Sequence, residues 1–265
     1  MIYSVIILAM GLLVTLDEHR KAEMEVGNFF RGRKFVDKKI AVITGAGSGL
    51  GASLSKKYSD MGYYVCLLGR TRKKLEQVAS KLSQSYSIYE VDVASKTKVE
   101  QTFTAIEKEV GDVDLLINNA GVGVFDLAEN ITEESVHQMI DINLKGTIFC
   151  AQAALTRMKK LNAGMIINVV STAGLEGKVT ESVYCASKFG VRGFTESITL
   201  ELKETPIRVF GAYMGGMNSE FWDGIYTKEQ TKNLMDPDDV ADIIIENTKA
   251  RRNLAVTEVV IKNKI

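Results

Sequence analysis

A glycine-rich turn between an apolar run and a helix-like stretch is the feature that most constrains the fold of this chain. The apolar run covers residues 39–43, the turn reads Thr-Gly-Ala-Gly-Ser-Gly-Leu-Gly over residues 44–51, and a helical pattern follows over residues 52–61. Glycines at such a junction let the backbone approach a pyrophosphate, whose charge meets free N–H groups and the positive end of the helix. A glycine-rich stretch alone could be only a turn, but the flanking strand and helix favour a dinucleotide-binding motif.

Seven apolar runs alternate with longer amphipathic stretches along the chain. The runs cover residues 40–44, 64–68, 86–93, 113–117, 165–171, 207–213 and 256–262. This order is typical of βαβ units, whose parallel strands are buried on both faces and therefore read as continuous apolar runs. The sequence predicts an α/β fold with a mainly parallel, seven-stranded sheet. Asp92, Asn119 and Ser171 each stand at or just beyond the end of a predicted strand, so they should meet the glycine turn at one edge of that sheet.

Composition narrows the class of protein. The chain has 265 residues with 46% hydrophobic and 25% charged content, which is enough for one large core. Its 33 basic side chains equal its 33 acidic ones, which argues against a nucleic-acid partner. Cys66, Cys150 and Cys185 lack the spacing of metal ligands, so we expect no metal site and reduced thiols in a cytoplasmic protein.

The first 38 residues form an apolar and basic extension outside this pattern, so we expect a single domain over residues 39–265. Residues 2–16 are almost wholly apolar but shorter than the about 20 residues that usually span a bilayer. Three alternatives remain open. The segment attaches the protein to a membrane, or it packs on the domain or a partner, or the start codon is assigned too early and residues 1–35 are not translated.

Tyr184 and Lys188 are four residues apart in a helix-like stretch, so their side chains share one face. A phenol with a pKa near 10 exchanges protons poorly at neutral pH, but a neighbouring ammonium favours the phenolate. An isolated pair at this spacing can also be a solvated contact.

Four motifs in this order resemble the short-chain dehydrogenase/reductase family, and the likeness extends over residues 39–263. They are Thr44-Gly45-x-x-x-Gly49-x-Gly51, Asn118-Asn119-Ala120-Gly121, Ser171 and Tyr184-x-x-x-Lys188. The resemblance implies a Rossmann-type doubly wound sheet with helices on both faces. It also implies an oxidoreductase that interconverts a carbonyl and an alcohol by hydride transfer to or from a nicotinamide cofactor.

The resemblance assigns catalytic roles to four residues. Ser171 stands 13 residues before Tyr184, as the family's serine does, and would donate a hydrogen bond to the carbonyl oxygen. Tyr184 would be the general acid/base, and Lys188 would lower its pKa and hold the nicotinamide ribose. Asn143 would bind a water of a proton relay by disturbing local helix bonding. A serine at a strand end is elsewhere commonly structural, and the spacing to Tyr184 favours the catalytic role here.

Cofactor choice depends on the end of the second predicted strand. Gly69 occupies the position where NAD-preferring relatives carry aspartate, and Arg70 follows it. An arginine can pair with a 2′-phosphate, so we expect NADP(H) to be preferred and NAD(H) to remain possible. Arg70 and the nearby Arg72 and Lys73 could instead be solvated charges at a helix start. The remaining residues assigned to the cofactor are Gly45, Gly47, Ser48, Gly49, Leu50 and Gly51 for the pyrophosphate, Asp92 and Val93 for adenine, Asn119 and Ala120 for the adenosine ribose, and Met217 and Ser219 for the nicotinamide. Asn119 could also simply hold the strand ends together.

The segment after the sixth predicted strand departs from the family. Met214 stands where many members have proline, and the aromatic stretch from Phe221 to Tyr226 follows. These aromatic residues either cap the core or cover a small apolar substrate. Two functions are compatible with the sequence: an oxidoreductase, expected to be a homodimer or homotetramer, or a dinucleotide-binding redox sensor or partner-binding protein with little turnover. The complete proton-transfer set favours the enzyme.

Overall fold

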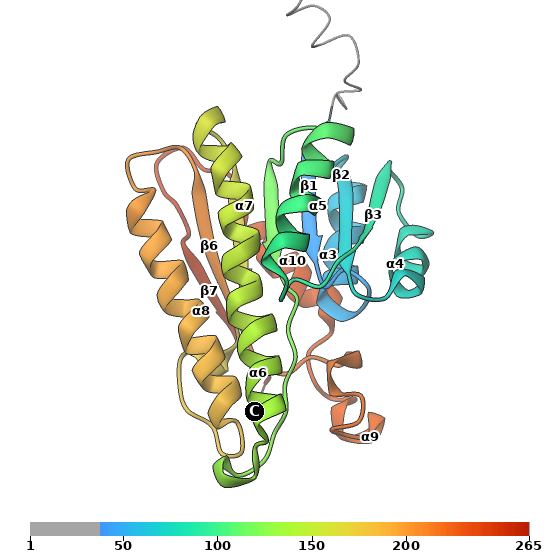
Figure 1. The fold of residues 1–265 in the computed structure, drawn as a ribbon, viewed down its shortest axis with the longest axis vertical. Helices are drawn as coiled ribbons and strands as arrows, with labels where there is room; N and C mark the ends of the chain where they lie inside the picture. The colour runs from blue at the N-terminus through green and yellow to red at the C-terminus, as the bar shows by residue number, and fades with distance from the viewer. Residues whose placement is uncertain (1–37, 265) are drawn as a thin grey trace, which may run out of the picture. The chain divides into compact units, whose positions relative to one another are not determined.

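A parallel β-sheet lies at the centre of the computed structural model, which describes residues 38–264 (Figure 1). The strands of this part of the chain are β1 (Ile40–Thr44), β2 (Tyr64–Gly69), β3 (Tyr86–Glu90), β4 (Leu115–Asn118), β5 (Met165–Val169), β6 (Arg208–Met214) and β7 (Glu258–Ile261). They form one seven-stranded sheet in the order β3-β2-β1-β4-β5-β6-β7, and every pairing is parallel. The predicted α/β, Rossmann-type fold is confirmed.

Helices cover both faces of the sheet (Figure 1). One face is covered by α5 (Lys96–Glu109), α7 (Gly146–Leu161) and α8 (Ser182–Glu201), and the other by α3 (Gly49–Asp60), α4 (Arg72–Ala79) and α10 (Pro237–Thr248). Shorter elements are η1 (Ala128–Asn130), α6 (Glu133–Met139), the π-helical η2 (Ile140–Lys145), η3 (Thr172–Gly174), η4 (Glu220–Trp222) and α9 (Lys228–Thr231).

The first strand shows why the apolar runs are continuous. Ile40 and Val42 pack into the core beneath α5 and α7, whereas Ala41 and Ile43 pack beneath α3 and α10. Successive side chains of a strand point to opposite faces. Because both faces are covered by helices, every position of this strand is buried, and the four residues before Thr44 are apolar.

The strand ends differ slightly from the prediction. The third strand ends at Glu90 rather than at residue 93, because the Asp92 carboxylate accepts a hydrogen bond from the Ala94 amide at 3.0 Å and starts a turn. The fifth strand ends at Val169, two residues before Ser171. These shifts leave the predicted residues at the carboxyl edge of the sheet.

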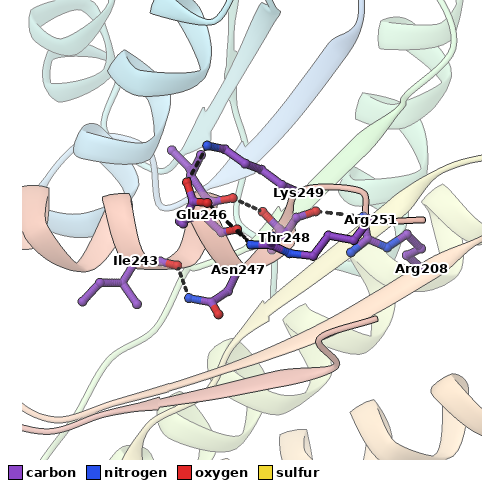
Figure 2. A network of polar contacts seen from close by, with 8 residues as sticks. Arg208, Ile243, Glu246, Asn247, Thr248, Lys249 and Arg251 are labelled. Carbon is purple, nitrogen blue, oxygen red and sulfur yellow. Dashed lines mark hydrogen bonds and ion pairs between the residues drawn. The ribbon is translucent and has the colours of Figure 1, made fainter. Parts of the chain in front are cut away.

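A polar network ties the end of α10 to the start of β6 (Figure 2). The Arg208 guanidinium donates to the Thr248 carbonyl at 2.8 Å, and Glu246 pairs with Lys249 and with Arg251. A cation at the carboxyl end of a helix is stabilised by the exposed carbonyls there. Arg208 begins its strand, so the network lies at the amino edge of the sheet and supports the fold, whereas the predicted site lies at the carboxyl edge.

The N-terminal extension lies almost wholly outside the part of the chain that the structure describes. The predicted membrane-attaching segment at residues 2–16 is therefore outside the described residues. Between residues 38 and 264, no helix combines the length and apolarity that crossing a membrane requires. The same part of the chain holds no cluster of three potential metal ligands.

Candidate active site

A cavity of about 800 Å³ opens at the carboxyl edge of the sheet. This volume lies within the range of small-molecule and cofactor sites. Twelve of the residues assigned from the sequence line it: Gly45, Ser48, Gly49, Leu50, Arg70, Asn119, Ala120, Ser171, Tyr184, Lys188, Met217 and Ser219. Five others do not: Gly47, Gly51, Asp92, Val93 and Asn143.

The glycine turn leaves hydrogen-bond donors free at the start of α3. Its N-cap residue, Ser48, makes no side-chain cap, and the first helical amide to find a protein acceptor is that of Ala52, which donates to the Ser48 carbonyl. In the described part of the chain, the amides of residues 48–51 donate to no protein group. Free donors at the positive end of a helix are suited to a phosphate, so the turn fits the pyrophosphate of a dinucleotide.

Two glycines of this turn are required by its geometry. Gly49 has a φ of 49°, in the left-handed region that side chains disfavour. A Cβ on Gly51 would lie 2.2 Å from the Gly45 carbonyl oxygen. Gly51 therefore lets the helix start against the strand end, and it contributes to the site through packing rather than by lining the cavity.

Asn119 has a structural role at the strand ends as well as a place in the cavity lining. Its amide nitrogen Nδ2 donates to the Thr44 carbonyl at 3.0 Å, and the Thr44 hydroxyl accepts from the backbone amides of Asn119 and Ala120 at 2.9 and 3.0 Å. These bonds connect the ends of β1 and β4, between which the sheet order reverses. Ligands of doubly wound sheets bind at such a switch point.

Ser171, Tyr184 and Lys188 come together in the cavity from two neighbouring elements. Ser171 follows β5, and α8 carries Tyr184 and Lys188 one turn apart. Both helical side chains are buried, with 8% of Tyr184 and 4% of Lys188 exposed. The Lys188 Nζ lies 5.8 Å from the centre of the Tyr184 ring and donates to the Val169 carbonyl at 3.1 Å. The two groups therefore face the same compartment.

Burial shifts the proton affinities of both groups. Burial raises the pKa of Tyr184, and the neighbouring Ser171 hydroxyl opposes this rise. Burial also lowers the pKa of Lys188 to about 8. Burial penalises a charge on either group and therefore opposes the lowering of the Tyr184 pKa expected from Lys188, which stays a prediction. Tyr184 is protonated at neutral pH, the state that can donate a proton.

The buried ammonium has a consequence for stability. The pKa of Lys188 falls from its ordinary 10.5 to about 8 on folding, so the unfolded chain binds more protons between these pH values. The buried charge lowers the free energy of unfolding by its full amount below pH 8, and this penalty disappears as the pH rises from 8 to 10.5. Lys188→Met should therefore raise the free energy of unfolding at pH 7 by about 1–3 kcal/mol.

Chemical denaturation of the wild type and Lys188→Met at pH 7 and pH 10 measures this effect. The advantage of the variant should shrink at the higher pH. A variant that is less stable at pH 7, or whose difference from the wild type is the same at both pH values, would contradict this interpretation.

Asn143 lies in a π-helical turn, in line with the expected disturbance of helix bonding. Its side chain is buried, with Oδ1 accepting from the Val122 amide at 2.8 Å and Nδ2 donating to the Val122 carbonyl at 2.9 Å and to Ser187 Oγ at 3.0 Å. A Cβ on Gly121 would contact both Asn143 Oδ1 and Lys188 Nζ, at 3.4 and 3.7 Å. Asn143 thus fixes the loop beside Lys188. Its role in a proton relay stays a prediction.

Two cations line the cavity beyond the second strand. Arg70 was predicted, whereas Lys74 was missed. A Cβ on Gly47 would lie 3.0 Å from the Cβ of Lys74, so α4 runs directly beside the glycine turn. Arg72 is instead paired with Glu76 at 2.9 Å. The basic run from Arg70 to Lys74, interrupted only by Thr71, is the signal that could have identified Lys74.

Asp92 and Val93 do not line the cavity. Val93 is buried, and a Cβ on Gly146 would lie 2.7 Å from its Cγ2 atom. Asp92 forms the turn described above. Their assignment to the adenine site stays a prediction.

The segment after β6 folds over the cavity. Phe221, Trp222 and Ile225 line it, and the Trp222 indole nitrogen donates to the Met217 carbonyl at 2.8 Å. Phe221 both lines the cavity and packs against the buried cluster around Tyr184, so covering of a substrate by this aromatic stretch stays a prediction. Met214, in the position of the family's proline, is buried at the end of β6. Phe125, Gln138, Lys178 and Glu181 also line the cavity and were not singled out from the sequence.

Comparison with known proteins identifies the family. The model of the short chain dehydrogenase family matches residues 39–230. The chain belongs to the short-chain dehydrogenase family. An uncharacterized oxidoreductase of Staphylococcus epidermidis is 32% identical over 230 residues, covering 86% of this chain and 98% of that protein. This short-chain dehydrogenase is accordingly an oxidoreductase.

Solved structures agree with this assignment. An alcohol dehydrogenase from the archaeon Thermococcus sibiricus, complexed with 5-hydroxy-NADP, superposes with a TM-score of 0.78 at 27% identity, covering 85% of this chain and 96% of that one. The closed form of a serine dehydrogenase complexed with NADP⁺ gives a TM-score of 0.78 at 27% identity, covering 83% and 93%.

Proposed function

We propose that this short-chain dehydrogenase interconverts a carbonyl compound and its alcohol with NADP(H), using Tyr184 as the general acid/base. The observation that carries the proposal is the convergence of Ser171, Tyr184 and Lys188 on the cavity that the glycine turn also lines. A sensor that only binds a dinucleotide would not need a proton-transfer set beside its binding site.

The lining of the cavity provides a place for each part of the cofactor. The free amides at the start of α3 would hold the pyrophosphate, and Asn119 with Ala120 the adenosine ribose. Lys188 would hold the nicotinamide ribose, and Met217 with Ser219 would contact the nicotinamide. When bound, the nicotinamide supplies the hydride for reduction or accepts it in oxidation.

The preference for NADP(H) rests on the cations at the adenosine end. Arg70 and Lys74 line the cavity there, and within residues 38–264 neither forms an ion pair. Unpaired cations suit a 2′-phosphate, which an aspartate at Gly69 would repel. The NADP⁺ in the related serine dehydrogenase and the 5-hydroxy-NADP in the related alcohol dehydrogenase support the same choice.

The chain's own residues would handle the proton. In reduction, the Tyr184 hydroxyl donates its proton to the carbonyl oxygen, which the Ser171 hydroxyl also holds by a hydrogen bond. In oxidation, the same oxygen of Tyr184 takes the proton back. The positive charge of Lys188, present below pH 8, stabilises the phenolate that follows proton donation. Asn143 would position the relay that reprotonates Tyr184.

NADPH consumption with a panel of aldehydes, ketones and quinones tests this proposal. We expect oxidation of NADPH with at least one carbonyl compound, formation of the matching alcohol, and a higher kcat/KM with NADPH than with NADH. Tight binding of NADPH without turnover of any carbonyl compound would overturn the enzymatic role and favour the sensor.

A further inference from the structure

Five aromatic rings form a continuous series of contacts that begins at Tyr184. Phe125 meets Tyr184 edge to face, with centroids 5.4 Å apart and an interplanar angle of 86°, and Phe221 lies 6.0 Å from Tyr184. Trp222 contacts Phe125 at 5.6 Å and Phe221 at 5.0 Å. Tyr226 lies 5.1 Å from Trp222. We call the rings of Phe125, Phe221 and Trp222, which line the cavity, the aromatic wall.

The aromatic wall leads from the proposed acid toward the surface. Its three side chains are half-buried, so they keep apolar surface open on the cavity side. Tyr226, at the far end of the series, is 47% exposed. A substrate whose carbonyl oxygen reaches Ser171 and Tyr184 would therefore have the wall beside the rest of its body.

The wall is held in place by the surrounding backbone. The Trp222 indole is fixed by its hydrogen bond to the Met217 carbonyl. Gly123 has no side chain where a Cβ would lie 2.6 Å from Phe125 and 2.9 Å from Phe221, so both rings rest against its backbone. Rings that are already fixed lose little conformational freedom when a ligand packs on them.

The lining near Tyr184 also includes polar and charged side chains beside the valines of the 122–124 loop. Gln138, Lys178 and Glu181 line the same cavity, and Lys178 Nζ donates to the Thr172 hydroxyl at 2.8 Å. The Asp126 amide donates to the Thr180 carbonyl at 2.9 Å, so the loop of Phe125 is tied to the loop of Lys178 and Glu181. A large, wholly apolar substrate such as a sterol would strip water from these charged groups without replacing their partners, which is unfavourable.

We propose that the substrate of this site is an aryl carbonyl compound, or the matching alcohol, whose ring packs on the aromatic wall. This inference rests on the proposed carbonyl–alcohol function and names its substrate class. Aromatic rings prefer edge-to-face and offset contacts with other aromatic rings, beyond the gain from burying their area. A compact ring can use the wall and leave the charged groups of the other loop hydrated.

A matched pair of ketones tests the role of the ring. Acetophenone and cyclohexyl methyl ketone place a flat and a saturated ring of similar size beside the same carbonyl. We expect kcat/KM to be about tenfold higher for acetophenone, equivalent to about 1.4 kcal/mol. Phe125→Leu should reduce this ratio to about one, whereas Tyr86→Leu, which removes an exposed ring on β3, should leave the ratio unchanged.

Equal kcat/KM values for the two ketones, or a ratio that Phe125→Leu does not change, would overturn the aryl assignment even if both ketones are reduced. If neither ketone is reduced, that result counts against the proposed function. The aryl assignment is then decided by measuring the binding of the matching alcohols.

Binding can be followed without turnover in Tyr184→Phe, which keeps the aromatic wall. Trp222 is the single tryptophan of the chain, so its emission reports on the wall. With NADP⁺ present, 1-phenylethanol should change this emission saturably, with a Kd about tenfold lower than that of 1-cyclohexylethanol. The same Kd for both alcohols, or no saturable change with either, would overturn the inference.

Discussion

Tyr184→Phe should lower kcat for carbonyl reduction by about 10²- to 10⁴-fold, the usual contribution of a positioned general acid. Burial keeps the phenol protonated at neutral pH, and phenylalanine retains the ring while removing the proton. The ring contacts with Phe125 and Phe221 should be preserved. The Kd for NADPH, measured by calorimetry, should change less than threefold.

A matched variant separates the hydroxyl from general effects of the substitution. Tyr63 lies outside the cavity lining and packs edge to face on Tyr58 with centroids 5.2 Å apart. Tyr63→Phe should keep the kcat of the wild type. Full activity in Tyr184→Phe, or an equal loss in Tyr63→Phe, would contradict the role of Tyr184.

The double variant Arg70→Ser/Lys74→Ser should lower kcat/KM with NADPH by about 10²-fold and leave kcat/KM with NADH nearly unchanged. Hydrogen bonds to charged groups contribute about 1.5–3 kcal/mol each, and exposure of Arg70 reduces the effect through solvent screening. The ratio of the two kcat/KM values is the measurement, because it cancels effects on folding and on the chemical step.

Arg72→Ser is the control for this pair, since Arg72 is engaged with Glu76 and does not line the cavity. It should leave the ratio unchanged. A wild type that prefers NADH, or a double variant that keeps the full preference for NADPH, would show that these cations do not select the cofactor.

The fold could be predicted from the sequence because parallel strands covered on both faces read as continuous apolar runs. The glycine turn was equally readable, since strand, turn and helix follow directly in the chain. The predicted end of the edge strand β3 was three residues too far along the chain. The turn at Asp92 depends on a side-chain hydrogen bond, which a pattern of apolar residues does not reveal.

The site could be predicted only where its residues stand in ordered motifs. Tyr184 and Lys188 share one helix, and Ser171 follows a strand at a fixed distance along the chain. Phe125 and Lys178 come from loops without any periodic pattern, and only tertiary packing brings them to the cavity. The raised pKa of Tyr184 was missed because spacing reports the neighbouring charge, whereas the degree of burial depends on the whole fold.

The pH dependence of alcohol oxidation by the wild type and Tyr184→Phe tests most directly whether Tyr184 transfers the proton. The wild-type kcat should rise with pH below about pH 8, where Lys188 keeps its charge, because the alcohol must pass its proton to the ionised oxygen of Tyr184. In Tyr184→Phe the small residual kcat should lack that rise. A residual rate that keeps the pH dependence of the wild type would place the ionising group elsewhere and contradict the account.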